Sequence, residues 1–382
     1  TPKLRFPEFR DAAAWEERSL GSVCQMQAGK FVGASDIHER SAPGFYPCYG
    51  GNGLRGYTKS FTHSGKFPLI GRQGALCGNV RLGLGQFHAT EHAVVTTPEP
   101  GVDVDWLFYV LGFLNLNRFA TGQAQPGLSV DVIAEIPVSK PVHETEQQKI
   151  AECLTTLDEV IAAQSQKLAA LKTHKKGLMQ QLFPREGETL PRLRFPEFQA
   201  APEWEVRNLA RVAENLDNRR VPITSSDRVA GDVPYYGASG VVDYVEGFIF
   251  DEDLLCVSED GANLVARTYP IAFPISGKTW VNNHAHVLRF EKLYTQKFVE
   301  VYLNSIKLDD FITGMAQPKL NKAMLDSIPI PYPDILEQQR IASCLTSLDD
   351  LILAQSAKLS ALKTHKRGLM QQLFPSPAEA DA

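Results

Sequence analysis

The sequence predicts an α+β fold in which two pseudo-symmetric globular α/β domains are separated by two long helices that form an antiparallel coiled coil. Three repeated features support this prediction. A stretch of 38 residues occurs at 147–184 and again at 338–375, with 9 positions changed. The motif LRFPEF precedes each copy, at 4–9 and at 193–198. Between motif and stretch, both halves keep a framework of Tyr, Gly, Gln-Pro and Ile-Pro, so the chain is predicted to be a duplication.

The first globular segment, from about Trp15 to Val142, is predicted to contain short strands and one helix. Its apolar runs are short and are broken by Gly and Pro, which is typical of strands joined by tight turns. One longer run has the apolar spacing of a helix instead. The predicted strands are 67–71, 79–85, 92–97 and 136–141, and the predicted helix is 105–120.

Residues 147–182 are predicted to form a long helix, because their apolar side chains step by alternate four and three positions. At ~1.5 Å per residue this helix would be roughly 55 Å long. Glu144 and Glu146 suit its first turn, and Pro184 ends it. The seam is Ile150, Leu154, Leu157, Ile161, Gln164, Leu168, Leu171, Lys175, Leu178 and Leu182.

The second copy repeats this seam, including its polar positions. A seam this narrow must be covered by another helix, and the other copy is the nearest partner. Gln164 and Gln355 would fix the register of the pair, whereas an ordinary long core helix is the alternative interpretation. The second seam is Ile341, Leu345, Leu348, Ile352, Gln355, Leu359, Leu362, Lys366, Leu369 and Leu373.

The two globular segments differ much more than the two helices do. The segment 46–57 is echoed by 233–244, and the segment 69–80 by 255–266, with different polar residues in each. A shared scaffold would therefore hold two modules that recognise different ligands. The predicted boundaries are 1–142 for the first domain, 143–184 for its helix, 185–333 for the second domain, 334–375 for its helix and 376–382 for a disordered tail.

Composition is that of a globular protein, with 43% hydrophobic residues and a net charge of −5. No run approaches the ~18 apolar residues of a membrane span, and TPKLRFPEFR lacks the apolar core of a signal peptide. Six cysteines without a CxxC pair are typical of a reducing compartment. We therefore expect a cytoplasmic protein that does not enter a membrane.

Motifs for catalysis and cofactor binding are not recognisable. The SGKT at 276–279 lacks the preceding glycine of a P-loop, and no GxGxxG joins a strand to a helix. His284 and His286 form an H-x-H that could ligate a metal, but a structural or hydrogen-bonding histidine is the better interpretation. The acidic run 251–253 is interpreted as a surface turn. We expect a non-catalytic chain with no metal and no cofactor.

Glycine-rich turns with Tyr, Asn, Arg and Gln suit contact with a nucleic acid, because Arg favours guanine and Gln or Asn favours adenine. Residues 1–140 carry 13 Lys and Arg against 12 Asp and Glu, and residues 192–333 carry 15 against 19. A DNA role would need a local basic face or a partner that supplies charge. For each candidate alone, a solvated surface residue is the alternative. The candidates are Lys30, Tyr49, Asn52, Arg55, Tyr57, Arg72, Gln73, His92, Gln125, Arg219, Arg220, Tyr236, Ser239, Asn263, Lys278, Asn283, His284, Gln317, Lys319 and Asn321.

These features resemble the specificity (S) subunit of type I restriction-modification enzymes. The resemblance rests on the two-fold layout, the Y-G-x-x-G segment, the A-Q-P turn, and the helix that begins EQQ and ends K-x-G-L-M-Q-Q-L-F-P. It implies two target recognition domains, each reading one half of a bipartite, asymmetric site in double-stranded DNA. It also implies that the helices pack antiparallel and dock methyltransferase (M) subunits, expected to be two, and that restriction (R) subunits complete the nuclease. The helix residues chosen for docking are Leu154, Leu157, Leu168, Leu171, Leu345, Leu348, Leu359 and Leu362.

Two other functions stay open. A stand-alone DNA-modifying enzyme is disfavoured by the missing cofactor motifs. A coiled-coil scaffold with two protein- or sugar-binding modules would be excluded by specific binding of duplex DNA in the presence of M subunits.

Overall fold

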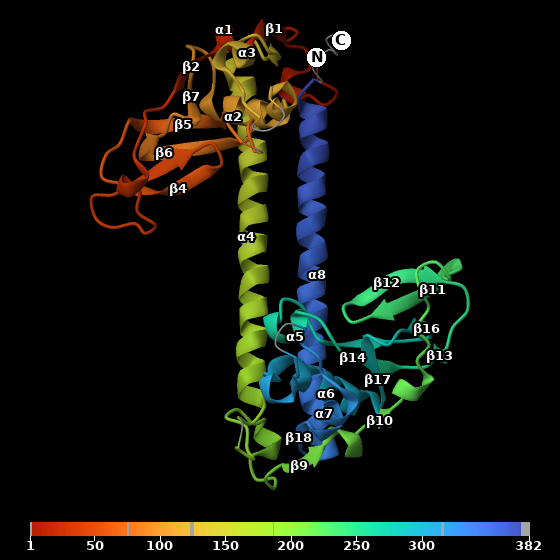
Figure 1. Cartoon of the computed structure of the whole chain (residues 1–382). Helices are drawn as coiled ribbons and strands as arrows, with labels where there is room; N and C mark the ends of the chain where they lie inside the picture. The colour runs from red at the N-terminus through yellow and green to blue at the C-terminus, as the bar shows by residue number, and fades with distance from the viewer. Residues whose placement is uncertain (1, 75, 123–125, 186, 315–316, 376–382) are drawn as a thin grey trace. The chain divides into compact units, whose positions relative to one another are not determined.

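The computed structural model describes residues 2–74, 76–122, 126–185, 187–314 and 317–375 (Figure 1). The chain divides into two compact units. Each unit contains one globular domain and part of each long helix, α4 (Glu144–Leu182) and α8 (Ile335–Leu373). Unit 1 is Thr1–Ser165 with Ala357–Ala382, and unit 2 is Gln166–Ser356. The candidate Gln125 and the predicted tail 376–382 lie outside the described residues.

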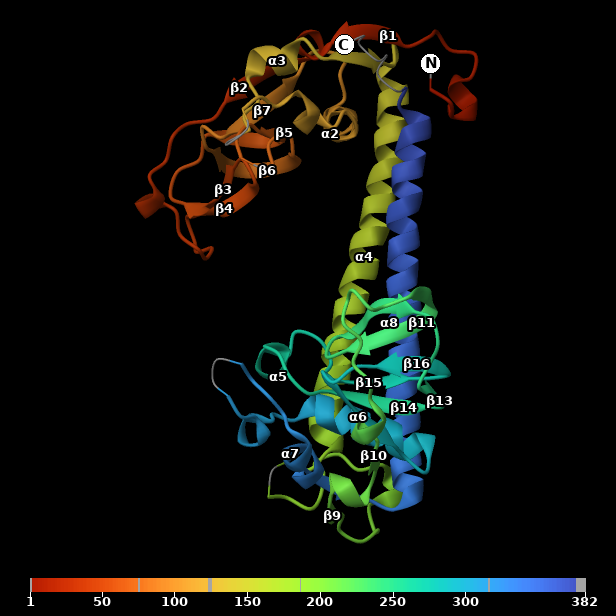
Figure 2. The same ribbon diagram turned by 45° about the vertical axis from the view of Figure 1, so that its right-hand side comes forward.

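Unit 1 is built on a six-stranded sheet in the order β2-β7-β5-β6-β3-β4, in which only β3 and β6 pair in parallel. Figure 2 shows the β3–β4 hairpin at one edge of this sheet. A separate antiparallel pair, β1–β8, closes the domain. The strands are β1 Glu16–Ser19, β2 Cys24–Ala28, β3 Tyr46–Gly50, β4 Gly53–Thr58, β5 His63–Gly71, β6 Val80–Ala89, β7 Ala93–Pro98 and β8 Pro137–Lys140. The helices are η1 Pro7–Phe9, α1 Leu20–Val23, η2 Ala34–Asp36, α2 Val104–Phe113, η3 Leu116–Phe119 and α3 Val130–Ala134, where η marks a 3-10 helix.

The predicted strands of the first domain are confirmed as β5, β6, β7 and β8, but the helix predicted over 105–120 is shorter. Asp103 caps α2 by accepting from the N–H groups of Asp105 and Trp106. The helix ends at Phe113, because Asn115 takes a left-handed conformation with φ 50°. Trp106 is fully buried in the core that α2 shares with the sheet and with the start of α4.

Unit 2 contains two four-stranded sheets, β10-β17-β14-β15 and β12-β11-β16-β13, and an antiparallel pair β9–β18. Both units therefore mix helices with sheets, which confirms the predicted α+β class and the two-domain organisation. The strands are β9 Glu205–Asn208, β10 Glu214–Asn215, β11 Ala230–Gly237, β12 Gly240–Val245, β13 Phe250–Asp251, β14 Leu254–Ser258, β15 Ala272–Ile275, β16 Lys278–Val281, β17 Ala285–Arg289 and β18 Pro329–Tyr332. The helices are η4 Pro196–Phe198, η5 Leu209–Arg211, η6 Asp217–Arg219, α5 Asn263–Ala266, α6 Leu293–Ser305, η7 Asp309–Phe311 and α7 Lys322–Ser327.

The repeated LRFPEF motif has a structural role at the start of each long helix. In unit 1, Arg5 binds the carboxylate of Glu146 through Nε and Nη2, each at 2.7 Å, and Trp15 donates its Nε1–H to the same carboxylate at 3.0 Å. In unit 2, Arg194 and Trp204 bind Glu337 in the same way. Both carboxylates are 1% exposed. A buried carboxylate needs charged and hydrogen-bonding partners, so motif, tryptophan and helix start must be duplicated together.

The long helices carry one interhelical ion pair in each unit. In unit 1, Lys366 of α8 lies 2.6 Å from Asp158 of α4, and Tyr109 also donates to Asp158. In unit 2, Lys175 of α4 pairs with Asp349 of α8. The two lysines that interrupt the predicted apolar seam are therefore matched by acids on the other helix. Among the described residues, no helix is both long enough and apolar enough to span a membrane.

Candidate nucleic-acid interface

Four loops of unit 1 meet at the ends of β3, β5 and β6. Arg72 donates its backbone N–H to the carbonyl of His92 at 3.0 Å, and its own carbonyl accepts from Leu128 N–H at 2.9 Å. Gly74 N–H donates to the carbonyl of Pro126 at 2.9 Å. These main-chain bonds make one surface from segments that are distant in sequence. We call this surface loop cluster 1, and it consists of residues 50–52, 72–74, 90–92 and 126–128.

The hairpin turn of cluster 1 is attached to β5 by a close backbone approach. A Cβ placed on Gly71 would lie 1.9 Å from the carbonyl oxygen of Gly51, so only glycine fits at position 71. On the other side of the turn, Thr90 N–H donates to the carbonyl of Tyr49 at 2.8 Å. Gly71 therefore serves the packing of β5 against the turn.

Three arginines in and beside cluster 1 are unpaired among the described residues. Arg55 is exposed, and its stem packs on the turn, since a Cβ on Gly50 would lie 2.5 Å from its Cδ. Arg72 is half-buried and Gln73 is exposed. Within the part of the chain that the structure describes, Arg55, Arg72 and Arg81 make no ion pair and no side-chain hydrogen bond, so their charges are available to a ligand. His92 lies 3.2 Å from the carboxylate of Glu91.

Unit 2 repeats the same main-chain connections. Glu259 donates its N–H to the carbonyl of His284 at 2.9 Å, and its own carbonyl accepts from Leu320 N–H at 2.7 Å. Gly261 N–H donates to the carbonyl of Pro318 at 3.1 Å. These bonds match those of cluster 1 one for one, so Glu259 stands where Arg72 stands in unit 1. We call this surface loop cluster 2, and it consists of residues 237–239, 259–261, 282–284 and 318–320.

A serine replaces the tightly packed glycine of cluster 1. Ser258 ends β14 as Gly71 ends β5, and its hydroxyl donates to the carbonyl of Ala238 at 2.5 Å. Asn282 N–H donates to the carbonyl of Tyr236 at 3.0 Å, as Thr90 does to Tyr49 in unit 1. The hairpin turn is therefore held at the same place in both units, by backbone contact in one and by a side-chain hydrogen bond in the other.

The side chains of cluster 2 have a different chemistry. The carboxylate of Glu259 binds Arg220 at 2.7 Å and Lys319 at 3.2 Å. Asp260 lies 2.7 Å from Nδ1 of His284, and this acid and histidine keep 33% and 52% of their side-chain surface exposed. Cluster 1 thus offers free cations, whereas the cations of cluster 2 are neutralised by an acid.

Asp217, Glu259 and His286 form the metal-ligand group that the described residues of unit 2 bring together. Arg220 fills the same space, since its guanidinium lies 2.7 Å from Glu259 and 3.4 Å from Asp217. Burial alone would raise the pKa of Asp217, but the hydrogen bond and charge of His286, the N–H of Val287 and Arg220 together lower it. This network is therefore a charge-balanced support beneath cluster 2, and His286 acts as the structural histidine that the sequence favoured.

The structure brings together about half of the candidate residues. Cluster 1 contains Asn52, Arg72, Gln73 and His92, with Arg55 beside them, and cluster 2 contains Ser239, Asn283, His284 and Lys319. Lys30 lies next to the end of β6, Tyr57 lies on β4, and Gln317 is exposed just before cluster 2. The remaining candidates bond inside the domains: Tyr49 edge-on to Phe87, Tyr236 stacked on Phe273, Arg219 with Glu252, Arg220 with Glu259, Asn263 with the Tyr269 carbonyl, Lys278 over Phe248, and Asn321 as the cap of α7.

Sequence reasoning missed Glu259, Asp260 and Arg81. A signal was present for the first two, because aligning the Gly-Ala at 74–75 with the Gly-Ala at 261–262 places Glu-Asp-Gly opposite Arg-Gln-Gly. Acids were not among the candidates, because carboxylates do not attract phosphate. Arg81 lies beside the β3–β4 turn, since a Cβ on Gly53 would be 3.5 Å from its Nε, and no sequence echo pointed to it.

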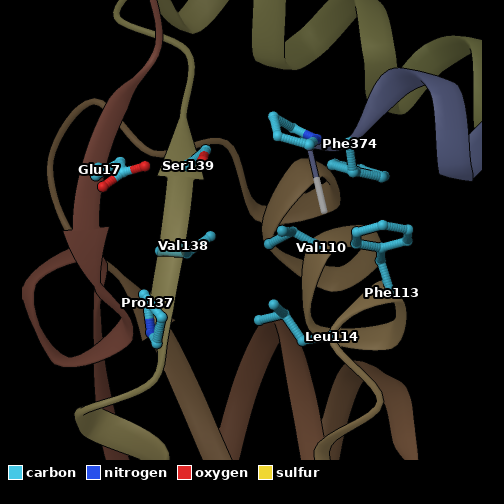
Figure 3. A pocket seen from close by; sticks show the side chains of 9 residues that line it. Glu17, Val110, Phe113, Leu114, Pro137, Val138, Ser139 and Phe374 are labelled. Carbon is cyan, nitrogen blue, oxygen red and sulfur yellow. The ribbon is translucent and has the colours of Figure 1, made fainter. Parts of the chain in front are cut away.

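Two hollows of unit 1 lie apart from the loop clusters. A small cavity of about 40 Å³ lies between the β1–β8 pair, α2 and Phe374, and its walls are mostly apolar, with Glu17 at one side (Figure 3). A wider hollow of about 530 Å³ is lined by residues 76–80, by α2 and by Lys366 and Met370 of α8. Burial raises the pKa of Tyr109 in its wall, so this phenol stays protonated as the donor to Asp158.

Both halves of the chain resemble known proteins. The family described as "Type I restriction modification DNA specificity domain" matches residues 13–173 and again residues 202–364. The type I restriction enzyme EcoprrI specificity subunit of Escherichia coli is 48% identical over 139 residues, which are 36% of this chain and 34% of that protein. A putative type I restriction enzyme specificity subunit of Haemophilus influenzae is 38% identical over 149 residues, or 39% and 38% of the two chains. The chain thus spans little more than a third of these curated relatives.

The fold has also been seen before. The crystal structure of a type I restriction-modification S subunit from M. genitalium superposes with a TM-score of 0.68 at 18% identity, covering 98% of this chain and 99% of that one. At this identity the likeness shows the fold alone. Because the family matches both halves and most of the sequence, the chain belongs to the type I restriction modification DNA specificity domain family, with one copy of the domain in each half.

Proposed function

We propose that the chain is the non-catalytic DNA-recognition subunit of a cytoplasmic type I restriction-modification complex. Each globular domain would read one half of a bipartite, asymmetric target in double-stranded DNA. One observation carries the proposal: loop clusters 1 and 2 have the same main-chain connections but different side chains. A common frame with different hydrogen-bonding groups is what two different half-sites require.

Cluster 1 supplies the groups for direct readout. Arg72 and Gln73 follow each other at its centre, and a guanidinium and an amide can pair bidentately with guanine and adenine. Arg55 and Arg81 add charge that would attract the phosphates of either strand. The net charge of the whole chain, −5, is then no obstacle, since the attraction is local.

The long helices would form an antiparallel coiled coil that separates the two domains and docks two M subunits, with R subunits joining the complete nuclease. The ion pairs Asp158–Lys366 and Lys175–Asp349 support antiparallel pairing, because equivalent residues exchange roles between the helices. Of the seam leucines proposed for docking, Leu154, Leu168 and Leu345 are buried in their units, and the other five are half-buried. They would support M subunits by holding the helices together, and exposed residues on the outer faces would make the contact.

Methylome sequencing of cells that express this chain with its M subunit tests the proposal. The expected result is a methylated motif with two specific parts and a gap. Replacing residues 15–142 with the same segment of a relative should change one part and leave the other intact. A motif in which both parts change, or the absence of any sequence preference, would refute independent reading.

A further inference from the structure

We propose that Asp260, positioned by His284, is a specificity-determining residue of the second domain and reads the exocyclic amino group of an adenine or a cytosine. This inference rests on the proposed function, which it deepens by naming the base chemistry. Loop clusters 1 and 2 have matching main-chain bonds. The main chains of Asp260 and Lys319 form an isolated antiparallel β-bridge, as those of Gln73 and Gly127 do in unit 1. Asp260 and Gln73 therefore occupy equivalent positions in the two loop clusters.

The pair Asp260–His284 presents acceptors rather than donors. An ionised aspartate only accepts hydrogen bonds, so Nδ1 of His284 must donate its hydrogen to Asp260 Oδ2 across their 2.7 Å distance. In the neutral imidazole, Nε2 is then an acceptor as well. Among the base edges of the major groove, the amino groups of adenine N6 and cytosine N4 are the donors that such acceptors can bind.

The surroundings show why Asp260 would face a base and not the DNA backbone. Its neighbour Glu259 is neutralised by Arg220 and Lys319, so the region as a whole does not repel DNA. Asp260 forms no ion pair with a lysine or an arginine among the described residues, and its side-chain partner is His284. A carboxylate placed against a phosphate would be repelled, whereas a carboxylate against an amino group gains a charge-assisted hydrogen bond.

The frame also fixes where this pair can point. His284 donates its backbone N–H to the side-chain oxygen of Asn282 at 2.8 Å, and its carbonyl accepts from Glu259. The histidine loop and the acid loop are thus bonded to each other through the main chain. His284 is exposed and Asp260 is half-buried, and both backbones are held, so the pair is preorganised for a contact.

The test uses the full chain with its M subunit. The methylome of Asp260→Asn is compared with that of the wild type and of Asp232→Asn, which removes the same charge at an exposed position of β11. We expect Asp260→Asn to relax or change one base pair of the second half-site, with the first half-site intact and with an unchanged melting temperature. Asp232→Asn should keep the wild-type motif.

A duplex in which the identified base lacks its exocyclic amino group gives the second measurement. Wild-type binding should weaken roughly tenfold to a hundredfold, and Asp260→Asn should not distinguish the two duplexes. Adenine and cytosine analogues tell the two bases apart. An unchanged motif for Asp260→Asn, or an equal loss on all sequences, would overturn the inference while leaving the bipartite motif in place. A wild-type motif with no second half-site would instead overturn the proposed function.

Discussion

Replacing Arg5 with alanine should destabilise unit 1 by about 3 kcal/mol, the lower end of the range for breaking a buried ion pair. The carboxylate of Glu146 is 1% exposed and receives two hydrogen bonds from Arg5 and one from Trp15. Without Arg5 it keeps only the indole N–H and stays buried as a charge. The lower end applies because the Arg5 side chain itself is 9% exposed, so water can enter the space that it leaves.

Urea unfolding of the full chain, followed by tryptophan fluorescence, measures this loss. Arg194→Ala is the matched variant, since Arg194 binds Glu337 through the same two atoms in unit 2, at 2.8 and 2.7 Å, and should cost as much. Arg18→Ala is the control, because the Arg18–Glu16 pair is 53% and 39% exposed and should contribute below about 1 kcal/mol. If Arg5→Ala and Arg18→Ala cost the same, the account of the repeated motif given above is wrong.

Three further outcomes are expected. Arg72→Ala and Gln73→Ala should each relax only the half-site read by the first domain, with little change in the salt dependence of binding; a uniform loss with a shallower salt slope would assign them to phosphate. Leu168→Asp and Leu359→Asp each put an unpaired charge into the seam. Both should therefore lower the melting temperature and reduce the amount of M subunit that co-purifies with the chain. Normal recovery of M subunit would argue against the coiled coil. The pKa of Asp217 is lower in the folded than in the unfolded chain, so its contribution to stability is complete above its ordinary pKa of 3.8 and is lost as the pH falls through the folded value. Urea midpoints measured from about pH 5 downward should therefore fall less steeply for Asp217→Asn than for the wild type.

Local patterns in the sequence predicted the elements well. The helices predicted at 147–182 and 338–373 are α4 and α8, which begin three residues earlier and end where expected. A heptad pattern is a property of the local sequence, so it can be recognised without knowledge of the fold. The helix at 105–120 was predicted too long because nothing in its apolar spacing shows that Asn115 takes a positive φ.

The candidate site could be predicted only in part, since partners distant in sequence decide which side chains are free. Arg72 and Arg220 are both arginines near a glycine-rich frame, yet Arg72 is available while Arg220 is bound to Glu259, 39 residues away. Asn263 was a candidate because it takes a place in the second module similar to that of the polar residues of the first, but it is buried and donates to the carbonyl of Tyr269. Pairings of this kind depend on the sheet order, which one sequence does not reveal.

Attachment of the loop clusters through main-chain atoms has a consequence for how new targets arise. The bonds that join the loops come from backbone carbonyl groups, which every residue has, and from backbone N–H groups, which every residue except proline has. A substitution at position 73 or 260 therefore leaves the frame bonded as before and changes only the groups presented outward. Under the proposed function, new half-sites would arise one substitution at a time with the bonds between the loops kept, and each domain would change while the other keeps its target.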